Sequence, residues 1–279
     1  MFSFLELIKH LNISPIQAID AGAALFDTDK YRPLLEQNLI HMIGFEPNSE
    51  EYQKCVANAT KNRTYLPYAL GNGSEETLYC CKNPLLSSLY KPNYALLNKF
   101  SIGIAGFEVI KEEAVQTHRL ENISEVQRVD YIKLDVQGAE LDILQGMGSL
   151  LNDTLIVETE IEFLPMYEGQ PLFGDLDLFL RKKGFQLFKI EGIMGNFFRP
   201  FVSLKEPFPA TRQWLTAEHA IYIKDFMKFD QLLPEALIKL AILLHDLYDA
   251  SDFCALALEQ YDLKTNSTLR NNYLEKFKS

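Results

Sequence analysis

Short apolar runs alternate with amphipathic stretches along the first two thirds of the chain, and the runs have the length and composition of buried strands. Residues 173–183 instead repeat their apolar positions with helical spacing, and Gly184 follows where a helix prefers to end. Alternating strands and helices favour a doubly wound, mostly parallel sheet, so an α/β fold is predicted. The strand-like runs are 16–20, 40–45, 64–70, 129–134, 154–161, 185–190 and 219–223.

Both ends of the chain have a helical pattern. The first residues form an amphipathic stretch, and from Phe229 onward apolar residues recur at intervals of three and four. We therefore expect an N-terminal helix over 1–13, an α/β domain over 14–227 and a helical C-terminal appendage over 228–279. The appendage has three possible places, on the flank of the sheet, over the crevice or between two chains of a homodimer.

The region after the third strand departs from this alternation. A turn at 71–74 and a β-like stretch at 77–81 predict a hairpin, residues 83–113 are interrupted by proline and glycine, and 114–120 fits an edge strand. A long irregular insertion in a compact domain usually has a function, so we interpret it as a lid or a substrate wall. The aromatic residues available for that wall, or for ordinary packing, are Tyr90, Tyr94 and Phe107.

The composition is that of an ordinary globular protein, with 279 residues of which 47% are hydrophobic and 23% charged. The net charge of −11 counts against a nucleic-acid partner, because phosphate binding needs a concentrated basic surface and no run of Lys and Arg is present. A small substrate that is neutral or cationic is expected instead.

No stretch predicts a membrane span, since the most apolar one, 236–247, is short and interrupted by charge. The N-terminal stretch lacks the small-residue cleavage site of a signal peptide. The four cysteines lack metal-type spacing and suit reduced thiols, so a cytoplasmic protein without a bound metal is expected. They are Cys55, Cys80, Cys81 and Cys254.

Three predicted strands end in a carboxylate. Asp20, Glu46 and Asp135 each stand where a strand should finish, and the carboxyl ends of parallel strands meet at the edge where ligands bind. Glu46 follows Gly22 by 24 positions, the spacing at which an acid accepts the hydroxyls of a cofactor ribose. The pattern therefore predicts a nucleoside-containing cofactor.

The pattern of glycines after the first strand distinguishes between two such cofactors. A pyrophosphate needs several glycines at a helix N-terminus, but Gly22 is followed by Ala23, Ala24 and Leu25. S-adenosyl-L-methionine carries no phosphate and therefore does not need several glycines at this turn. Asp20 would accept from its ammonium group or orient the loop, and backbone N–H groups near Gly22 would receive its carboxylate. A nicotinamide-dependent oxidoreductase is the weaker alternative.

Several short motifs together resemble the FkbM family of S-adenosylmethionine-dependent methyltransferases, over about residues 14–225. The resemblance implies a class I, Rossmann-like methyltransferase fold, and O-methylation of a hydroxyl on a small molecule or a sugar. The stretch 160–173 is also similar to a subgroup of the family. The motifs are Ile19-Asp-Ala-Gly-Ala23, Gly44-Phe-Glu-Pro-Asn48, Tyr68-Ala-Leu-Gly71, Ser87-Ser-Leu89 and Ile132-Lys-Leu-Asp-Val-Gln-Gly-Ala-Glu140.

The resemblance also implies site residues. The cofactor site would contain Asp20, Ala21, Gly22, Glu46, Pro47, Asn48, Ala69, Leu70 and Asp135, and the acceptor site Ser87, Ser88, Glu160 and Tyr31. The family usually has a second glycine after its first motif. Here a polar loop at 23–31 replaces it, so Asp27, Asp29 or Tyr31 is expected to take part.

Asp135 is the first candidate for a catalytic base. A hydroxyl must lose its proton as it accepts a methyl group, which requires a base within hydrogen-bond reach. The alternative is that Asp135 only orients the cofactor or the next helix. Glu140 is expected to hold the turn through backbone N–H groups. His118 and His219 are alternative bases, although a lone histidine on a strand is more often a packing residue.

Glu158, Glu160 and Glu162 alternate along one strand and therefore share a face. They predict a polar pocket, a cation site or merely a solvated edge. Asp135 with Glu160 is too small a set of ligands to predict a metal. An alternative from another class is a cofactor-binding or interaction module whose methyltransferase site has decayed.

Overall fold

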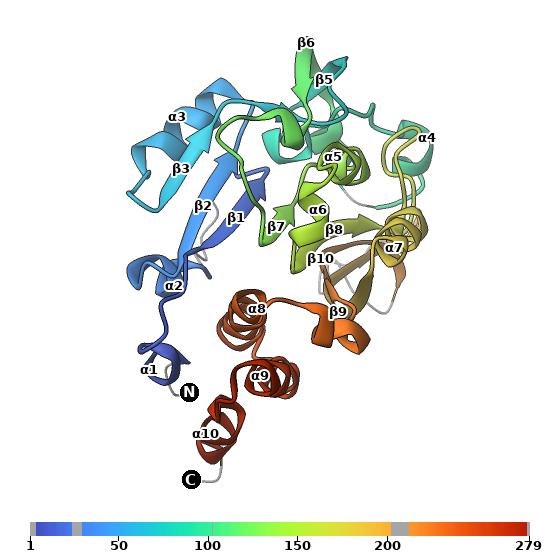
Figure 1. The fold of residues 1–279 in the computed structure, drawn as a ribbon. Helices are drawn as coiled ribbons and strands as arrows, with labels where there is room; N and C mark the ends of the chain where they lie inside the picture. The colour runs from blue at the N-terminus through green and yellow to red at the C-terminus, as the bar shows by residue number, and fades with distance from the viewer. Residues whose placement is uncertain (1–3, 24–29, 102, 202–211, 278–279) are drawn as a thin grey trace.

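The computed structural model describes residues 4–23, 30–101, 103–201 and 212–277. Its main sheet has seven strands, of which β10 alone runs antiparallel to its neighbours β8 and β9. The doubly wound α/β fold is therefore confirmed (Figure 1). In spatial order the strands are β3 (Arg63–Leu66), β2 (Ile40–Phe45), β1 (Ile16–Ala21), β7 (Tyr131–Leu134), β8 (Ile156–Glu162), β10 (Gln213–Lys224) and β9 (Phe185–Asn196).

Helices cover both faces of this sheet because alternate strand residues are apolar on both sides. Ile132 and its neighbours pack against α5 (Glu140–Gly146), α6 (Leu150–Asp153) and α7 (Phe173–Lys182). Tyr131 and its neighbours pack on the opposite face against α8 (Pro234–Asp246). The remaining α-helices near the N-terminal half are α1 (Phe4–Ile8), α2 (Arg32–Glu36) and α3 (Ser49–Ala57).

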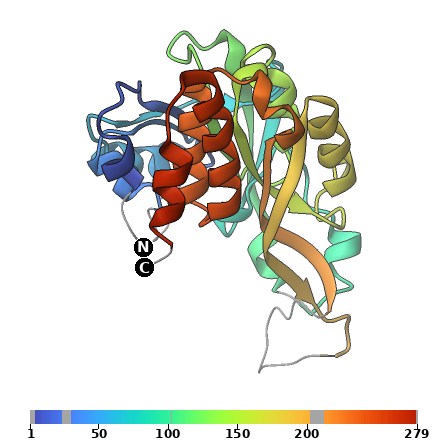
Figure 2. The same cartoon turned by 60° about the horizontal axis from the view of Figure 1, so that its bottom comes forward.

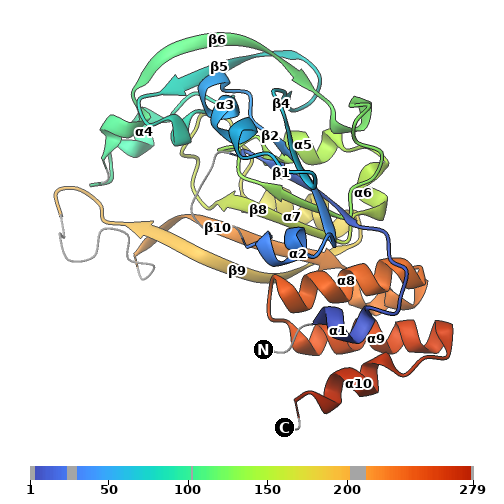
Figure 3. The same cartoon turned by 90° about the vertical axis from the view of Figure 1, so that its left-hand side faces the viewer.

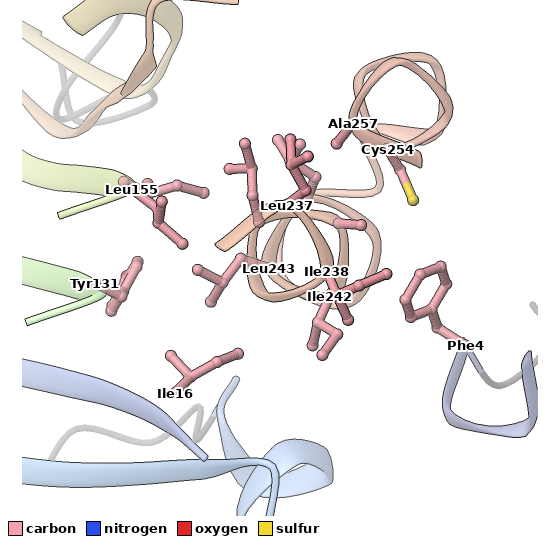
Figure 4. Packing of buried hydrophobic residues seen from close by; sticks show 14 of the residues in the cluster. Phe4, Ile16, Tyr131, Leu155, Leu237, Ile238, Ile242, Leu243, Cys254 and Ala257 are labelled. Atoms are coloured by element: carbon pink, nitrogen blue, oxygen red, sulfur yellow. The ribbon is translucent and has the colours of Figure 1, made fainter. Parts of the chain in front are cut away.

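The C-terminal helices share a core with the sheet. Figure 4 shows Leu237 and Leu243 of α8 directed toward Ile16, Tyr131 and Leu155 at the base of the sheet. The helix α9 (Ser251–Thr265) lies alongside α8, and α10 (Leu269–Glu275) lies alongside α9 (Figures 2 and 3). Of the three places considered for the C-terminal helices, the structure shows them on the flank of the sheet. The domain bounds and a homodimer stay predictions.

One charged pair lies inside this core. Lys239 on α8 is fully buried, and its Nζ lies 3.0 Å from Oδ2 of Asp130, which is also fully buried. A buried ion pair is costly to break by removing one partner, because the other charge is then left uncompensated. The pair therefore fixes α8 to the start of β7. No helix in the described ranges has the length and apolarity to span a membrane.

A small second sheet occupies the opposite end of the molecule from the C-terminal helices (Figures 1 and 3). Its order is β4 (Ala69–Leu70), β6 (Val109–His118) and β5 (Glu75–Cys81). Three expectations are corrected here. The strand expected over 64–70 is divided into β3 and β4, and the expected edge strand at 114–120 is instead a long central strand. The hairpin expected around the turn at 71–74 is wrong, because β4 and β5 lie on either side of β6 and each pairs with it.

The irregular insertion precedes β6 and contains short helical turns: η1 (Pro84–Leu86), α4 (Tyr94–Leu97) and η2 (Ile104–Phe107). Single 3-10 turns also occur at η3 (Leu120–Asn122) and η4 (Phe226–Gln231). The insertion folds around Phe100 and Phe107, which form a small core with Tyr167 from the segment after β8. It is therefore a packed wall at the end of the main sheet where the carboxyl ends of β1 and β2 lie (Figure 1).

Candidate active site

A cleft of about 1460 Å³ opens at the carboxyl ends of the parallel strands. Its size exceeds the few hundred to a thousand cubic ångströms of an ordinary small-ligand site, so it has room for two ligands. Every residue of the cofactor and acceptor sites that the family resemblance implied lines it, although the role of each residue there stays a prediction. These are Asp20, Ala21, Gly22, Tyr31, Glu46, Pro47, Asn48, Ala69, Leu70, Ser87, Ser88, Asp135 and Glu160.

Gly22 brings the ends of β1 and β7 together. Its φ is +81°, and a Cβ at this position would lie 1.9 Å from the carbonyl oxygen of Asp135. Only glycine tolerates both the conformation and this approach. The N–H of Gly22 also donates to the carbonyl of Phe45 at 3.2 Å, which ties the turn to the end of β2.

Glu46 lies at the end of β2 with little exposure. Its Oε1 accepts from the backbone N–H of Asn48 at 2.8 Å, while the Asn48 side chain caps α3 by accepting from Glu50 and Glu51. Burial raises the pKa of Glu46 above its usual value. A carboxylate held in this way is suited to accept hydrogen bonds from a pair of ribose hydroxyls.

Asp20 lies at the end of β1 and is nearly buried. Its Oδ1 has no hydrogen-bond partner among the described residues, and the ammonium of Lys133 lies 4.0 Å away. Burial raises the pKa of Asp20. A buried carboxylate oxygen without a donor fits a ligand that brings its own cation, as the amino group of S-adenosylmethionine does.

Asp135 stands just beyond β7, and 42% of its side chain is exposed to the cleft. Its Oδ2 lies 3.3 Å from Nζ of Lys133, and its Oδ1 accepts from Nε2 of Gln137 at 3.2 Å. Although Lys133 is mostly buried, the carboxylates of Asp20 and Asp135 hold its pKa above the usual value. Lys133 and Gln137 therefore each hold one oxygen of the Asp135 carboxylate, and the rest of the carboxylate is open to the cleft.

Glu140 closes the turn after Asp135. Its carboxylate accepts from the N–H groups of Val136 and Gly138, both at 3.0 Å, as the sequence suggested. Burial raises its pKa to about 7. The side chain points into the protein and not into the cleft, since it is 1% exposed and does not line the cleft.

The three glutamates of β8 share one face and are all buried, so the solvated edge considered from sequence is wrong. Glu158 receives Lys30 Nζ at 2.5 Å, Tyr131 OH at 2.8 Å and Tyr248 OH at 2.5 Å. The Nδ1 atom of His219 lies 2.9 Å from its Oε1. Burial opposes ionisation, but His219 and Lys30 hold the pKa of Glu158 well below its usual value.

Glu160 has a different environment two residues further on. Its Oε2 accepts from Nε2 of Gln137 at 2.5 Å, and its Oε1 from the hydroxyl of Thr216 at 3.2 Å. Burial, together with the charges of Asp135 and Glu162, raises the pKa of Glu160 well above its usual value. No cluster of three or more His, Cys, Asp or Glu in the described chain is arranged to hold a metal ion.

Some candidates do not line the cleft. His118 packs on the ring of Tyr68 at 4.8 Å between centroids, and the Tyr90 hydroxyl donates to Asp142 at 2.7 Å. Tyr94 donates to the backbone of Phe107, and of the expected aromatic wall only Phe107 lines the cleft. His219 lines it but is bound to Glu158. Asp27 and Asp29 lie outside the described residues.

Among the polar residues of the cleft that the sequence analysis did not assign to the site are Lys30, Lys133, Gln137 and Tyr167. Lys133 was open to prediction, because it lies on the same face of β7 as Tyr131 and Asp135. Gln137 and Tyr167 lie within stretches that resemble the family, but nothing in those stretches indicated a role for either side chain. Their role depends on contacts between segments far apart in the chain.

This sheet order, with acids at the ends of β1 and β2 facing one cleft, defines an S-adenosylmethionine-binding fold of the class I methyltransferases. The profile of the methyltransferase FkbM domain matches residues 20–187, and the chain belongs to this family. The chain is thus a member of a family of S-adenosylmethionine-dependent methyltransferases, and the lack of a pyrophosphate-binding glycine pattern after Gly22 agrees with this cofactor.

One characterised relative is the 2-O-methyltransferase NoeI of Sinorhizobium fredii (strain NBRC 101917 / NGR234), 42% identical over 69 residues. The alignment covers 23% of this chain and 28% of NoeI, so the chain spans little more than a quarter of that relative's length.

Solved structures also resemble the chain in outline. A candidate methyltransferase from Thermoplasma acidophilum has 10% identity and a TM-score of 0.39, covering 80% of this chain and 76% of the other. Sp1610 of Streptococcus pneumoniae, a candidate tRNA (m1A22) methyltransferase, has 12% identity and a TM-score of 0.35, covering 98% and 100%. The family match and the strand order identify the class of this chain.

Proposed function

We propose that the protein transfers a methyl group from S-adenosylmethionine to a hydroxyl oxygen of a small molecule or saccharide, with Asp135 as the general base. The observation that carries this proposal is the exposure of Asp135. It is the carboxylate beside β7 that opens into the cleft, whereas the glutamates of β8 are buried. NoeI is a 2-O-methyltransferase, and this similarity supports oxygen as the acceptor atom.

The cofactor, when bound, supplies an electrophilic methyl group on sulfur. Asp20 would accept from its ammonium group, backbone groups near Gly22 would receive its carboxylate, and Glu46 would accept from its ribose hydroxyls. Ala69 and Leu70 offer an apolar surface on the same side of the cleft. These residues bind and orient, which supplies much of the rate of an in-line displacement.

Asp135 would accept the acceptor's proton as its oxygen forms the new bond to carbon and the carbon–sulfur bond breaks. The electron pair of that bond stays on sulfur, leaving S-adenosylhomocysteine, and the proton stays on Asp135 until water removes it. Lys133 keeps a positive charge beside the ionised base. General base catalysis of this kind typically contributes a factor of about 10² to 10⁴.

The test uses the full chain, methyl-labelled S-adenosylmethionine and a panel of methyl glycosides, each paired with its 2-deoxy counterpart. If the protein methylates a 2-hydroxyl group as NoeI does, we expect label transfer to a glycoside but not to its 2-deoxy partner. Asp135→Asn should lower turnover by about 10²-fold or more. Its affinity for S-adenosylhomocysteine, measured by calorimetry, should stay within a few-fold.

Three results would contradict this proposal. Loss of S-adenosylhomocysteine binding in Asp135→Asn would place Asp135 in the cofactor site instead. Equal binding by wild type and Glu46→Ala would remove Glu46 from it. Binding without turnover on any hydroxyl compound would favour a module without activity. A cytoplasmic location and a homodimer remain predictions.

A further inference from the structure

Gln137 has an unusual backbone and an unusual set of partners. Its φ is +58°, a left-handed conformation that side chains other than glycine rarely adopt. It lies between the proposed base Asp135 and Gly138, in the turn from β7 to α5. A non-glycine residue held in such a conformation at a site is a reason to look for a function of its side chain.

The amide group of Gln137 joins two acids. Its Nε2 donates to Oδ1 of Asp135 at 3.2 Å and to Oε2 of Glu160 at 2.5 Å. A side-chain amide nitrogen carries two hydrogens, so both bonds can form at once. The hydroxyl of Tyr167 lies 3.2 Å from the amide oxygen and 3.0 Å from the carbonyl oxygen of Leu86, and it shares its one hydrogen between them. The contact favours the orientation in which the amide nitrogen faces the acids.

The backbone of Gln137 is also anchored. Its carbonyl oxygen accepts from the hydroxyl of Ser88 at 2.6 Å. Ser88 belongs to the irregular insertion, and Tyr167 to the segment after β8, and both line the cleft. Gln137 is therefore the point where the floor of the cleft meets two of its walls.

We propose that Gln137 is a positioning residue that lets Asp135 act as the base by placing one neutral donor between it and Glu160. This inference rests on the proposed role of Asp135. Leu134 pairs with Thr159, so Asp135 and Glu160 extend from neighbouring positions of adjacent parallel strands. Without a donor between them, two ionised carboxylates so close would repel each other.

Other charged groups around the pair do not replace this donor. Lys133 is the cation beside it and contacts Asp135 from the far side. The other titratable groups facing the pair are Asp20 from β1, Glu140 from α5, Glu162 from β8, Tyr167 from the following segment, and Glu218 and His219 from β10. Burial and the neighbouring acids raise the pKa of Glu160 well above its usual value, whereas 42% of the Asp135 side chain is exposed. The amide donates to both carboxyl groups, so it can stabilise either one when it is ionised.

The test follows the protonation of Glu160 directly and needs no acceptor. The full chain, labelled with ¹³C at its Glu carboxyl carbons and saturated with S-adenosylhomocysteine, is titrated by NMR, with Glu160→Gln to assign the resonance. In Gln137→Met, which keeps the length but removes both donors, we expect the Glu160 midpoint to rise by about one pH unit. Tyr167→Phe, which frees the amide, should give a smaller rise.

Ser88→Ala is the matched control, since it removes the backbone anchor and leaves the amide donors in place. It should leave the Glu160 midpoint within a few tenths of a unit. An unchanged midpoint in both Gln137→Met and Tyr167→Phe would overturn the inference. An equal rise in Ser88→Ala would do so as well, because it would assign the effect to the turn and not to the amide.

The pH dependence of kcat/KM separates this inference from the proposed function. On a glycoside that accepts label, Gln137→Met should move the acid limb of the kcat/KM profile upward, whereas a merely structural loss would lower it at every pH. An acid limb that stays in place while the Glu160 midpoint moves would overturn the positioning role. Full turnover in Asp135→Asn would instead reject the proposed base and leave the NMR result standing.

Discussion

Glu158 and Glu160 lie two residues apart on the same buried face of β8, yet they differ in almost every contact. Glu158 receives hydrogen bonds from three separate segments, one of them bearing the cation Lys30, and Nδ1 of His219 lies 2.9 Å away. Glu160 receives neutral donors from Gln137 and Thr216 and also lies beside the carboxyl group of Asp135. The pKa of Glu158 is lowered and that of Glu160 raised. Because burial raises the pKa of both acids, the difference between them comes from the groups that surround each carboxylate.

The difference divides the polar face of the sheet into two parts. The part around Glu158 is closed, and links the residue before α2 to the turn after α8 through the hydroxyls of Tyr31, Tyr131 and Tyr248. The part around Glu160 faces the cleft beside the exposed Asp135. The first part has the contacts of a structural element, and the second those of a site that handles protons.

The largest effect is expected from Glu158→Gln. A glutamine cannot balance Lys30 or accept all the donors around this position, so charged and hydroxyl groups lose their partner. Removing one member of a buried ion pair costs about 3 to 5 kcal/mol, and we expect a loss of that size at pH 7. Urea unfolding of wild type and variant measures it.

The acid range sharpens that prediction. Because the folded-state pKa of Glu158 is lowered, its contribution to stability is present above about pH 4.5 and is lost as the pH falls through the folded value. The gap between wild type and Glu158→Gln should therefore narrow below pH 4.5. A gap that stays constant with pH would contradict the assigned ionised state.

A smaller effect is expected from Tyr248→Phe. This change removes one donor to an ionised, buried carboxylate, and a hydrogen bond to a charged group is worth about 2 kcal/mol. Tyr261→Phe is the matched control, because Tyr261 is comparably buried on α9 and its hydroxyl makes no hydrogen bond in the described part of the chain. Equal losses in the two variants, measured by urea unfolding, would sink the proposed role of Tyr248.

The smallest effect, and one of opposite sign, is expected from Glu160→Gln. Because the folded-state pKa of Glu160 is raised, the acid opposes folding increasingly as the pH rises above about 4.5. The variant should match wild type near pH 5 and be more stable at pH 8, by about 1 kcal/mol or more. A loss of stability in Glu160→Gln at pH 8 would show that Glu160 is ionised in the folded protein. Glu158 and Glu160 would then have the same charge.

The sequence was sufficient for the regular part of the molecule. Acids at the ends of β1, β2 and β7 were expected to meet, and they line one cleft, because parallel strands share one carboxyl edge. The helices after residue 229 were expected from spacing alone and are present. Both depend on local periodicity, which is visible in a single chain.

The remainder depends on contacts that span the chain. Tyr248 reaches Glu158 from 90 positions away, and Ser88 reaches Gln137 from 49 positions away. Ser88 was assigned to the site from a motif, but no local pattern shows which distant residue either side chain contacts. The same holds for β6, whose central place depends on pairing with both β4 and β5 and not on its own residues. This is why the walls of the cleft were harder to predict than its floor.

The missing Cβ of Gly22 has a consequence for how this enzyme can change over generations. The turn proposed for the cofactor touches the backbone carbonyl of the proposed base, so neither can drift without displacing the other. New acceptors must then be accommodated in the insertion around Phe107 and in the segment around Tyr167. The molecule thus separates an inherited core that tolerates little variation from walls that are free to diversify.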